Sequence, residues 1–237
     1  MKKVAILQSN YIPWKGYFDM INMVDEFILY DCVQYTKNDW RNRNLIKTPS
    51  GVQWLTIPCR VESLHQRIDE TKVSDKSWAS KHLKSIIQNY SKAPYFKEYI
   101  AVFEALYKEV QNEEYLSIIN YKFLTTINNI LGIKTKISNC QDFTLIEGQT
   151  SRLVQMCKDA NADIYISGPA AKNYLDESLF EEVGIRVEWM DYSGYKEYNQ
   201  LFGEFAHGVS IIDLIFNEGS NATKYMKSFG EERDDTV

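Results

Sequence analysis

The sequence has few histidines and cysteines, and none of them is spaced as a metal site. Three histidines and four cysteines are scattered over 237 residues: His65, His82, His207, Cys32, Cys59, Cys140 and Cys157. No HxxxH or CxxC spacing occurs, which argues against a structural zinc site. Cysteines that lie this far apart are expected to be reduced and structural, as in a cytoplasmic protein.

No long hydrophobic run is present either. The chain begins Met-Lys-Lys and continues into the apolar run Val4–Leu7, which is too short for the core of a signal peptide. No stretch reaches the roughly 18 apolar residues of a transmembrane helix. We therefore expect a cytoplasmic protein without a membrane span.

The sequence also lacks an excess of positive charge. Its formal net charge is −5 and its pI is near 5.4, which argues against nucleic acid as a partner but not against a local basic pocket. Aromatic residues, in contrast, make up 14% of the chain, with 16 tyrosines. They predict either an amphipathic cleft for a sugar or a base, or a tyrosine-rich core and a homodimer interface.

The first quarter of the chain contains short apolar runs separated by turn residues. Val4–Gln8, Trp14–Met23 and Phe27–Tyr30 are read as strand, helix and strand. Arg43–Lys47 and Val52–Ile57 flank the turn sequence Thr-Pro-Ser-Gly, which is typical of a β-hairpin.

From Ser77 to Leu131 the apolar residues recur at helical spacing, so three helices are predicted there. Further elements are expected at Lys134–Ile137, Ser151–Asn161, Asp163–Ser167, Leu179–Val183, Ile185–Trp189 and Val209–Asn217. The predicted fold is α/β: a Rossmann-like, mostly parallel sheet with a β-hairpin and a three-helix insertion at about 76–132. One domain over 1–230 is expected, with a disordered acidic tail over 231–237.

The loop after the first strand, in "SNYIPWKGYF", lies where α/β proteins often bind phosphates, but it has no glycine cluster. Trp14-Lys-Gly16-Tyr17 has the spacing of the H-x-G-H signature of nucleotidyltransferases, with Trp and Tyr in place of the histidines. Neither can carry the positive charge that stabilises a transferring phosphoryl group. The alternative is that Trp14 and Phe18 only pack the helix onto the sheet.

A second candidate stretch, "YTKNDWRNRNLIK", interleaves basic residues and asparagines around Trp40. In an extended chain Arg41 and Arg43 project to one side. Such guanidinium forks suit a phosphate or a carboxylate. We include Lys37, Asn38 and Asn42 in this candidate site; the alternative is an ordinary solvated hairpin.

A third stretch, Ser167-Gly168-Pro169, joins a predicted strand to a helix start, with Lys172 in the first turn. Exposed N–H groups at the start of this helix would attract an anion. The alternative is an ordinary helix start without a ligand, which has the same sequence pattern.

Two residues are candidate proton acceptors. His82 lies four residues after Trp78 on one helix face, which fits a general base or a packing residue. Asp31 follows the second predicted strand, at the carboxyl edge of the sheet, where acids and bases of α/β enzymes often lie.

Six blocks carry a resemblance to a known family: "VAILQSNYIPWKGYFDMI", "DCVQYTKNDWRNRNLIK", "WLTIPC", "WASKHLKSIIQNYSKAPYF", "DIYISGPAAKNYL" and "SIIDLIFNEG". In this order, from about residue 3 to residue 219, they resemble the WbqC-like protein family. Ser9 stands where the family usually has proline, which leaves the backbone there less restricted. The resemblance implies a role among proteins of bacterial surface polysaccharide and O-antigen synthesis.

The resemblance implies acyl or glycyl-type decoration of a nucleotide-linked amino sugar, with an amino-acid or acyl donor; ATP or an acyl donor remains open as the cofactor. Nucleotidyl transfer and non-catalytic binding of a nucleotide sugar are the alternatives. Arg41, Arg43 and Lys172 are candidates for an anion, and His82 or Asp31 for the base. The first loop and its surroundings supply the remaining candidate binding residues: Gln8, Asn10, Tyr11, Trp14, Gly16, Tyr17 and Trp40.

Overall fold

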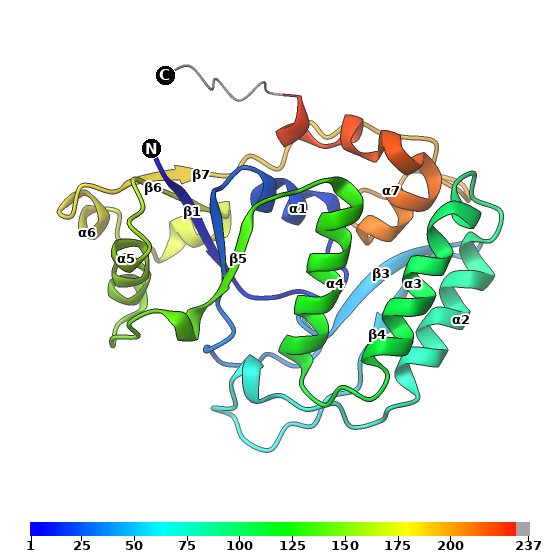
Figure 1. The fold of residues 1–237 in the computed structure, drawn as a ribbon, viewed down its shortest axis with the longest axis horizontal. Coiled ribbons are helices and arrows are strands. Elements are labelled where there is room, and N and C mark those ends of the chain that lie inside the picture. Colours follow the sequence, from blue (N-terminus) through cyan, green and yellow to red (C-terminus); the bar gives the residue numbers. More distant parts are fainter. Residues whose placement is uncertain (231–237) are drawn as a thin grey trace.

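The protein is built on a five-stranded parallel sheet, seen at the left of the computed structural model in Figure 1, which describes residues 1–230. The strands lie in the order β5-β2-β1-β6-β7. Their bounds are Lys136–Asn139, Glu26–Leu29, Lys3–Leu7, Ile164–Ser167 and Arg186–Trp189. This is a Rossmann-like order, and it reverses direction between β1 and β6. The tail over 231–237 lies outside the described residues.

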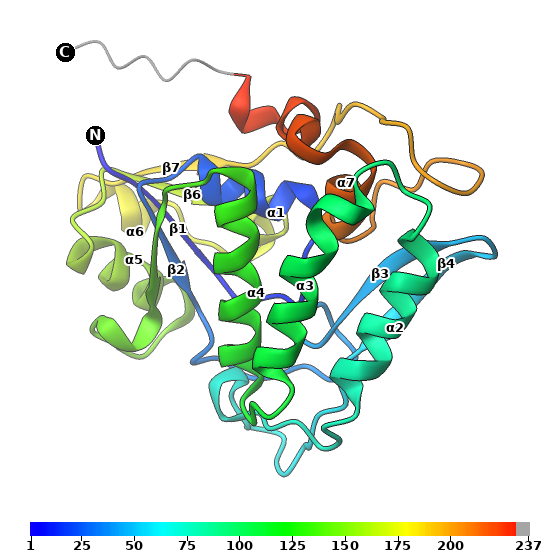
Figure 2. The same ribbon diagram turned by 45° about the vertical axis from the view of Figure 1, so that its right-hand side comes forward.

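The predicted hairpin and three-helix insertion are confirmed. The antiparallel pair β3 (Arg43–Thr48) and β4 (Gly51–Thr56) forms a separate sheet. Helices α2 (Trp78–Tyr90), α3 (Phe96–Val110) and α4 (Leu116–Leu131) follow. Figures 1 and 2 show these helices and the hairpin together, at the opposite end of the molecule from α5 and α6.

The remaining helices differ in detail from the sequence prediction. They are α1 (Lys15–Asn22), α5 (Gln149–Asp159), α6 (Ser178–Glu181) and α7 (Ile211–Glu218). The helix expected at Pro169 is instead a short 3₁₀ helix, Pro169–Asn173. A helix this short has little macrodipole, so the basis for an anion site at its start is weakened.

Alternate side chains of the sheet contribute to two separate cores. Ala5 and Phe27 belong to the larger core, which includes residues of α1, α4 and α7. Val4 and Ile28 belong to the smaller one, packed against α5 and α6. This period of two is expected for a parallel sheet covered on both faces.

The long irregular segment between β7 and α7 is held down by buried charges. Lys15 donates from Nζ to the backbone oxygen of Lys196 (2.9 Å), and Lys47 donates to Oε1 of Gln200 (2.9 Å). Tyr198 donates to Asp213 (2.6 Å). Burial lowers the pKa of Lys15 to about 8. These contacts fix residues 196–200 against the hairpin and the two helices α1 and α7.

Candidate functional site

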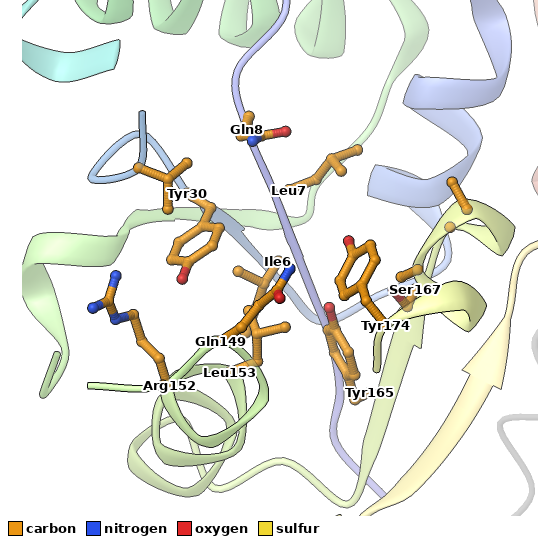
Figure 3. Close-up of a pocket in the computed structure, with 15 residues that line it drawn as sticks. Ile6, Leu7, Gln8, Tyr30, Gln149, Arg152, Leu153, Tyr165, Ser167 and Tyr174 are labelled. Atoms are coloured by element: carbon orange, nitrogen blue, oxygen red, sulfur yellow. The ribbon is translucent and has the colours of Figure 1, made fainter. Parts of the chain in front are cut away.

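A cavity of about 460 Å³ lies at the carboxyl ends of β1 and β6, where the strand order reverses (Figure 3). We call it the switch-point pocket. Rossmann-like proteins bind ligands at this position, because the connections of the neighbouring strands leave there in opposite directions. Its polar and aromatic lining consists of Gln8, Tyr30, Gln149, Arg152, Tyr165, Ser167 and Tyr174.

Arg152 supplies the charge of this pocket from the first turns of α5. Its Nε donates to the backbone oxygen of Ile146 (2.7 Å), which fixes the orientation of the guanidinium. Burial raises the pKa of the neighbouring Tyr30, and Arg152 opposes that rise. The pocket therefore combines a fixed cation with aromatic rings.

The tyrosines of the pocket differ in burial. Tyr165 is buried and stacks on Phe180 with ring centroids 5.0 Å apart. Tyr174 is 53% exposed and lies across the pocket from Tyr30 in Figure 3. Tyr174 is thus a ring that folding leaves accessible.

The first loop, which we define as residues 8–14, is tightly held. The backbone N–H of Ser9 donates to Oδ1 of Asp31 (2.8 Å), and Nδ2 of Asn120 donates to the Ser9 hydroxyl (3.0 Å). The Tyr17 hydroxyl donates to the carbonyl of Gln8 (2.9 Å). Burial raises the pKa of Asp31 to about 6, although its bonds from Ser9 work in the opposite direction. Asp31 thus lies at the carboxyl edge, as the sequence predicts, but it lines a separate cavity with Asp69.

The backbone of this loop is strained at Ile12. Its φ is +36°, an outlier for a β-branched residue, and its side chain is fully buried. Asn44 donates from Nδ2 to the carbonyl of Tyr11 (3.0 Å), and the Tyr11 N–H donates to the carbonyl of Trp40 (3.0 Å). Such strain persists only where the surroundings impose it, and it often occurs at functional sites.

His82 belongs to a buried group that we call the Tyr11–His82 cluster. Its Nε2 lies 3.1 Å from the carbonyl of Thr56, which can only accept, so Nε2 carries the proton. Nδ1 then accepts from the Tyr11 hydroxyl (2.9 Å), which in turn bonds to the Tyr107 hydroxyl (2.6 Å). Burial lowers the pKa of His82 to about 4. His82 is therefore neutral with both nitrogens occupied, and its role as a base stays a prediction.

A second cavity, of about 300 Å³, is lined by Asn10, Pro13, Trp14, Trp40, Asn44, His207 and Gly208. We call it the tryptophan pocket. A Cβ at Gly16 would lie 2.3 Å from the Trp14 ring, so the absence of a side chain lets this indole lie against the start of α1. Trp14 also meets Tyr192 and Tyr195 edge to face, with centroids 5.3 Å apart in each case.

The side chains of the second candidate stretch, residues 35–47, do not form one basic site but contact different partners. Arg41 donates to Oδ1 of Asn10 and pairs with Asp39 (3.1 Å). Arg43 instead lies over the ring of Trp54, with its guanidinium carbon 4.0 Å from the centroid. The other members are spread between surface and core. Lys37 and Asn38 are exposed, whereas Asn42 is buried and donates to the carbonyl of Ile57 (2.9 Å).

Only part of the third stretch reaches the switch-point pocket. Ser167 and Gly168 line it, but Lys172 does not, and its Nζ lies 5.3 Å from the Trp189 ring centroid. Sequence reasoning included Gln8 but missed Arg152 and the three tyrosines. Tyr30 is the last residue of a predicted strand, and this position at the carboxyl edge of the sheet is the one signal that would have suggested it.

Within 1–230, no three His, Cys, Asp or Glu side chains come together in a group that could hold a metal ion. No helix in the same range has both the length and the apolar character that crossing a membrane requires.

Comparison with known proteins gives a consistent family assignment. The sequence profile of the WbqC-like protein family matches residues 8–225. The "Uncharacterized protein Rv1507c" of Mycobacterium tuberculosis (strain ATCC 25618 / H37Rv) is 50% identical over 228 residues, which cover 96% of this chain and 98% of that protein. No solved structure matches the chain significantly. The profile match and this identity over nearly the whole chain show that the protein belongs to the WbqC-like protein family.

Proposed function

We propose that this protein acylates or aminoacylates the amine of a nucleotide-linked amino sugar in bacterial surface-glycan synthesis, with the nucleotide in the switch-point pocket. The observation that carries the proposal is the position and lining of this pocket. It lies at the reversal of the strand order and joins Arg152 to three tyrosine rings. Pockets for nucleotides in α/β proteins have this location and this mixture of groups.

Arg152 is suited to the diphosphate of such a ligand. Its Nε is already bound to the carbonyl of Ile146, so the side chain is held in place before a ligand arrives. A guanidinium fixed in this way binds phosphate oxygens with little loss of conformational freedom. The rings of Tyr30 and Tyr174 offer faces for the base or the ribose.

The chemical step requires a proton acceptor, because an amine that attacks an acyl carbon must lose a proton. Asp31 fits this role electrostatically, since a carboxyl with a pKa of about 6 is mostly ionised at pH 7. It lines the neighbouring cavity, so the proposal requires the sugar amine to reach that side of β2. His82 remains the second candidate base.

Calorimetric titration with a uridine-diphosphate-linked 4-amino sugar tests the nucleotide site. Removing a charge-assisted contact costs about 1.5–3 kcal/mol, so Arg152→Ala should weaken binding by roughly 10- to 100-fold. Arg152→Lys should retain part of the affinity. Arg186→Ala is the matched control, because Arg186 pairs with Glu188 on the surface. If the ligand does not bind, or binds Arg152→Ala as tightly as the wild type, the switch-point pocket is not the nucleotide site.

Turnover is tested by mass spectrometry, with the same sugar, a panel of amino acids with ATP, and activated acyl donors. A mass increase on the sugar is expected. Tight binding without any product would favour the second candidate, a non-catalytic binding protein. One observation supports that candidate: neither His82 nor Asp31 lines the switch-point pocket. Nucleotidyl transfer gains no such support. Tyr17 stands where the H-x-G-H signature has its second histidine, but it is buried and its hydroxyl donates to the carbonyl of Gln8.

A further inference from the structure

We propose that the tryptophan pocket is a second ligand site, which binds an uncharged pyranose ring. The proposal goes beyond the nucleotide site and holds whether or not the switch-point pocket binds a nucleotide. It rests on four features of the pocket: exposed indole rings, oriented polar groups, a lining without cations, and a rigid wall.

The first feature is a pair of exposed tryptophans. Trp40 and Trp54 are each 41% exposed, and their ring centroids lie 5.3 Å apart. Arg43 covers one face of Trp54, while Trp40 borders the cavity. Large apolar side chains that gather at a surface usually serve binding, because their exposure gives folding little stabilisation. An indole face matches the C–H face of a pyranose.

The second feature is the polar groups that surround the rings. Arg41 donates to Oδ1 of Asn10 and is itself held by Asp39, so the Asn10 amide has a fixed orientation. Its Nδ2 group is then directed away from Arg41 and can donate to a hydroxyl. His207 adds an imidazole to the lining, with Nε2 3.7 Å from Oε1 of Glu197. A few oriented polar groups in a mostly apolar cavity are typical of small-molecule sites.

The third feature distinguishes this cavity from the switch-point pocket. None of its lining residues is a lysine or an arginine. The nearby Arg41 is already engaged with Asp39 and Asn10, and Arg43 is stacked on Trp54. A phosphate here would lack a dedicated cation, whereas a neutral sugar requires none. The two cavities are therefore suited to chemically different ligands.

The fourth feature is a wall that is set before binding. Trp14 rests on Gly16 and against two tyrosines, and the adjoining backbone is held in the strained conformation at Ile12. The first residue of α7, Ile211, donates to the carbonyl of Pro13 (2.9 Å), which fixes the other end of the loop. A rigid wall loses little entropy when a ligand binds, so the strain has a functional explanation.

The probes are methyl β-glucopyranoside, N-acetylglucosamine and uridine diphosphate, each titrated against the full-length protein. Saturation-transfer NMR and tryptophan fluorescence report binding. We expect both sugars to bind, with strongest transfer to their ring C–H protons. Trp40→Ala should weaken their binding at least 10-fold, and Trp40→Phe should restore part of it. Tyr121→Ala, at another exposed aromatic on α4, is the matched control and should bind as the wild type does.

The outcomes separate this proposal from the nucleotide site. Arg152→Ala should leave sugar binding unchanged while it weakens binding of uridine diphosphate. If the wild type does not bind uridine diphosphate but binds the sugars through Trp40, only the nucleotide proposal fails. If the sugars do not bind, or bind equally to Trp40→Ala with an unchanged circular dichroism spectrum, the pyranose site is wrong. Competition between sugar and uridine diphosphate at Trp40 would also overturn the proposal of a second site, because both ligands would then occupy one site.

Discussion

The Tyr11–His82 cluster and the switch-point pocket contain similar side chains but use them differently. Each gathers tyrosines around one nitrogen-containing side chain, the neutral His82 in the cluster and the cationic Arg152 in the pocket. In the cluster, Tyr11 is fully buried and His82 is 7% exposed, with both ring nitrogens bonded. In the pocket, Tyr174 is half-exposed beside a cavity of about 460 Å³. Access, rather than residue type, distinguishes a packing group from a binding group.

The cluster owes its burial to the way the helical insertion meets the first loop. Trp78 and Phe123, from α2 and α4, both contact the Tyr11 ring edge to face. Polar atoms in such a place are costly unless each one is bonded, and together they specify a single arrangement. The cluster therefore fixes the inner side of the first loop.

The largest expected effect is on stability, at the centre of the cluster. Tyr11→Ala removes a fully buried ring and the partner of His82, so we expect a loss of about 3–5 kcal/mol in the free energy of unfolding. Tyr174→Ala removes an exposed ring and should change that free energy by less than about 0.5 kcal/mol. Urea denaturation measures both. Equal losses in the two variants would remove the distinction between cluster and pocket.

Acidification provides a second test of the cluster. Because His82 has a pKa of about 4 in the fold and an ordinary value of 6.5, protons bind preferentially to the unfolded chain between these pH values. The free energy of unfolding should thus fall as the pH falls from 6.5 towards 4, by up to about 3 kcal/mol. His82→Gln preserves a donor for Thr56 and an acceptor for Tyr11, and should remove this contribution.

Asp31 should act in the opposite direction. Its pKa is raised from 3.8 to about 6, so its contribution to stability is full below 3.8 and is lost as the pH rises through 6. Asp31→Asn should therefore make the loss of stability on acidification steeper than in the wild type. Urea denaturation at a series of pH values between 7 and 4 measures both variants. A pH dependence that His82→Gln leaves unchanged would show that His82 is accessible to protons in the folded protein.

The sequence predicts the periodic parts of this fold well. The three helices of the insertion were expected because their apolar residues recur over long stretches, which leaves little ambiguity. The short strand β5, in contrast, begins at Lys136 rather than Lys134, and the helix expected at Pro169 is a 3₁₀ helix. Four or five residues contain too little periodicity to fix a boundary, and tertiary contacts decide it.

The candidate site was less predictable, because its residues come from distant parts of the chain. Spacing correctly placed His82 beside Trp78, whose rings meet with centroids 5.3 Å apart. It gave no indication that Thr56 and Tyr11 would occupy both imidazole nitrogens. Residue spacing also could not predict that Arg152 lies at the carboxyl end of β1, because that position depends on how α5 packs across the sheet.

A smaller effect is expected on ligand binding, where the tryptophan pocket and the switch-point pocket should respond differently to one substitution. Gly16→Ala places a methyl group into the Trp14 ring, so the indole must shift, at a cost of about 1–3 kcal/mol. Binding of N-acetylglucosamine to the tryptophan pocket should weaken, whereas binding of uridine diphosphate to the switch-point pocket should not change. Fluorescence titration of both ligands measures this. If both affinities decrease equally, the cavities respond as one site.

The smallest effect is expected at Lys172, which the sequence places at an anion site. Its Nζ lies over the ring of Trp189 and does not line the switch-point pocket, and the 3₁₀ helix that carries it is short. Lys172→Ala should therefore alter binding of uridine diphosphate by less than about twofold, a small free-energy difference. Arg152→Ala, measured in parallel by calorimetry, provides the contrast. A loss of tenfold or more for Lys172→Ala would show that the phosphates lie at the start of this helix, and that the charge of the site comes from the 3₁₀ helix after β6 rather than from α5.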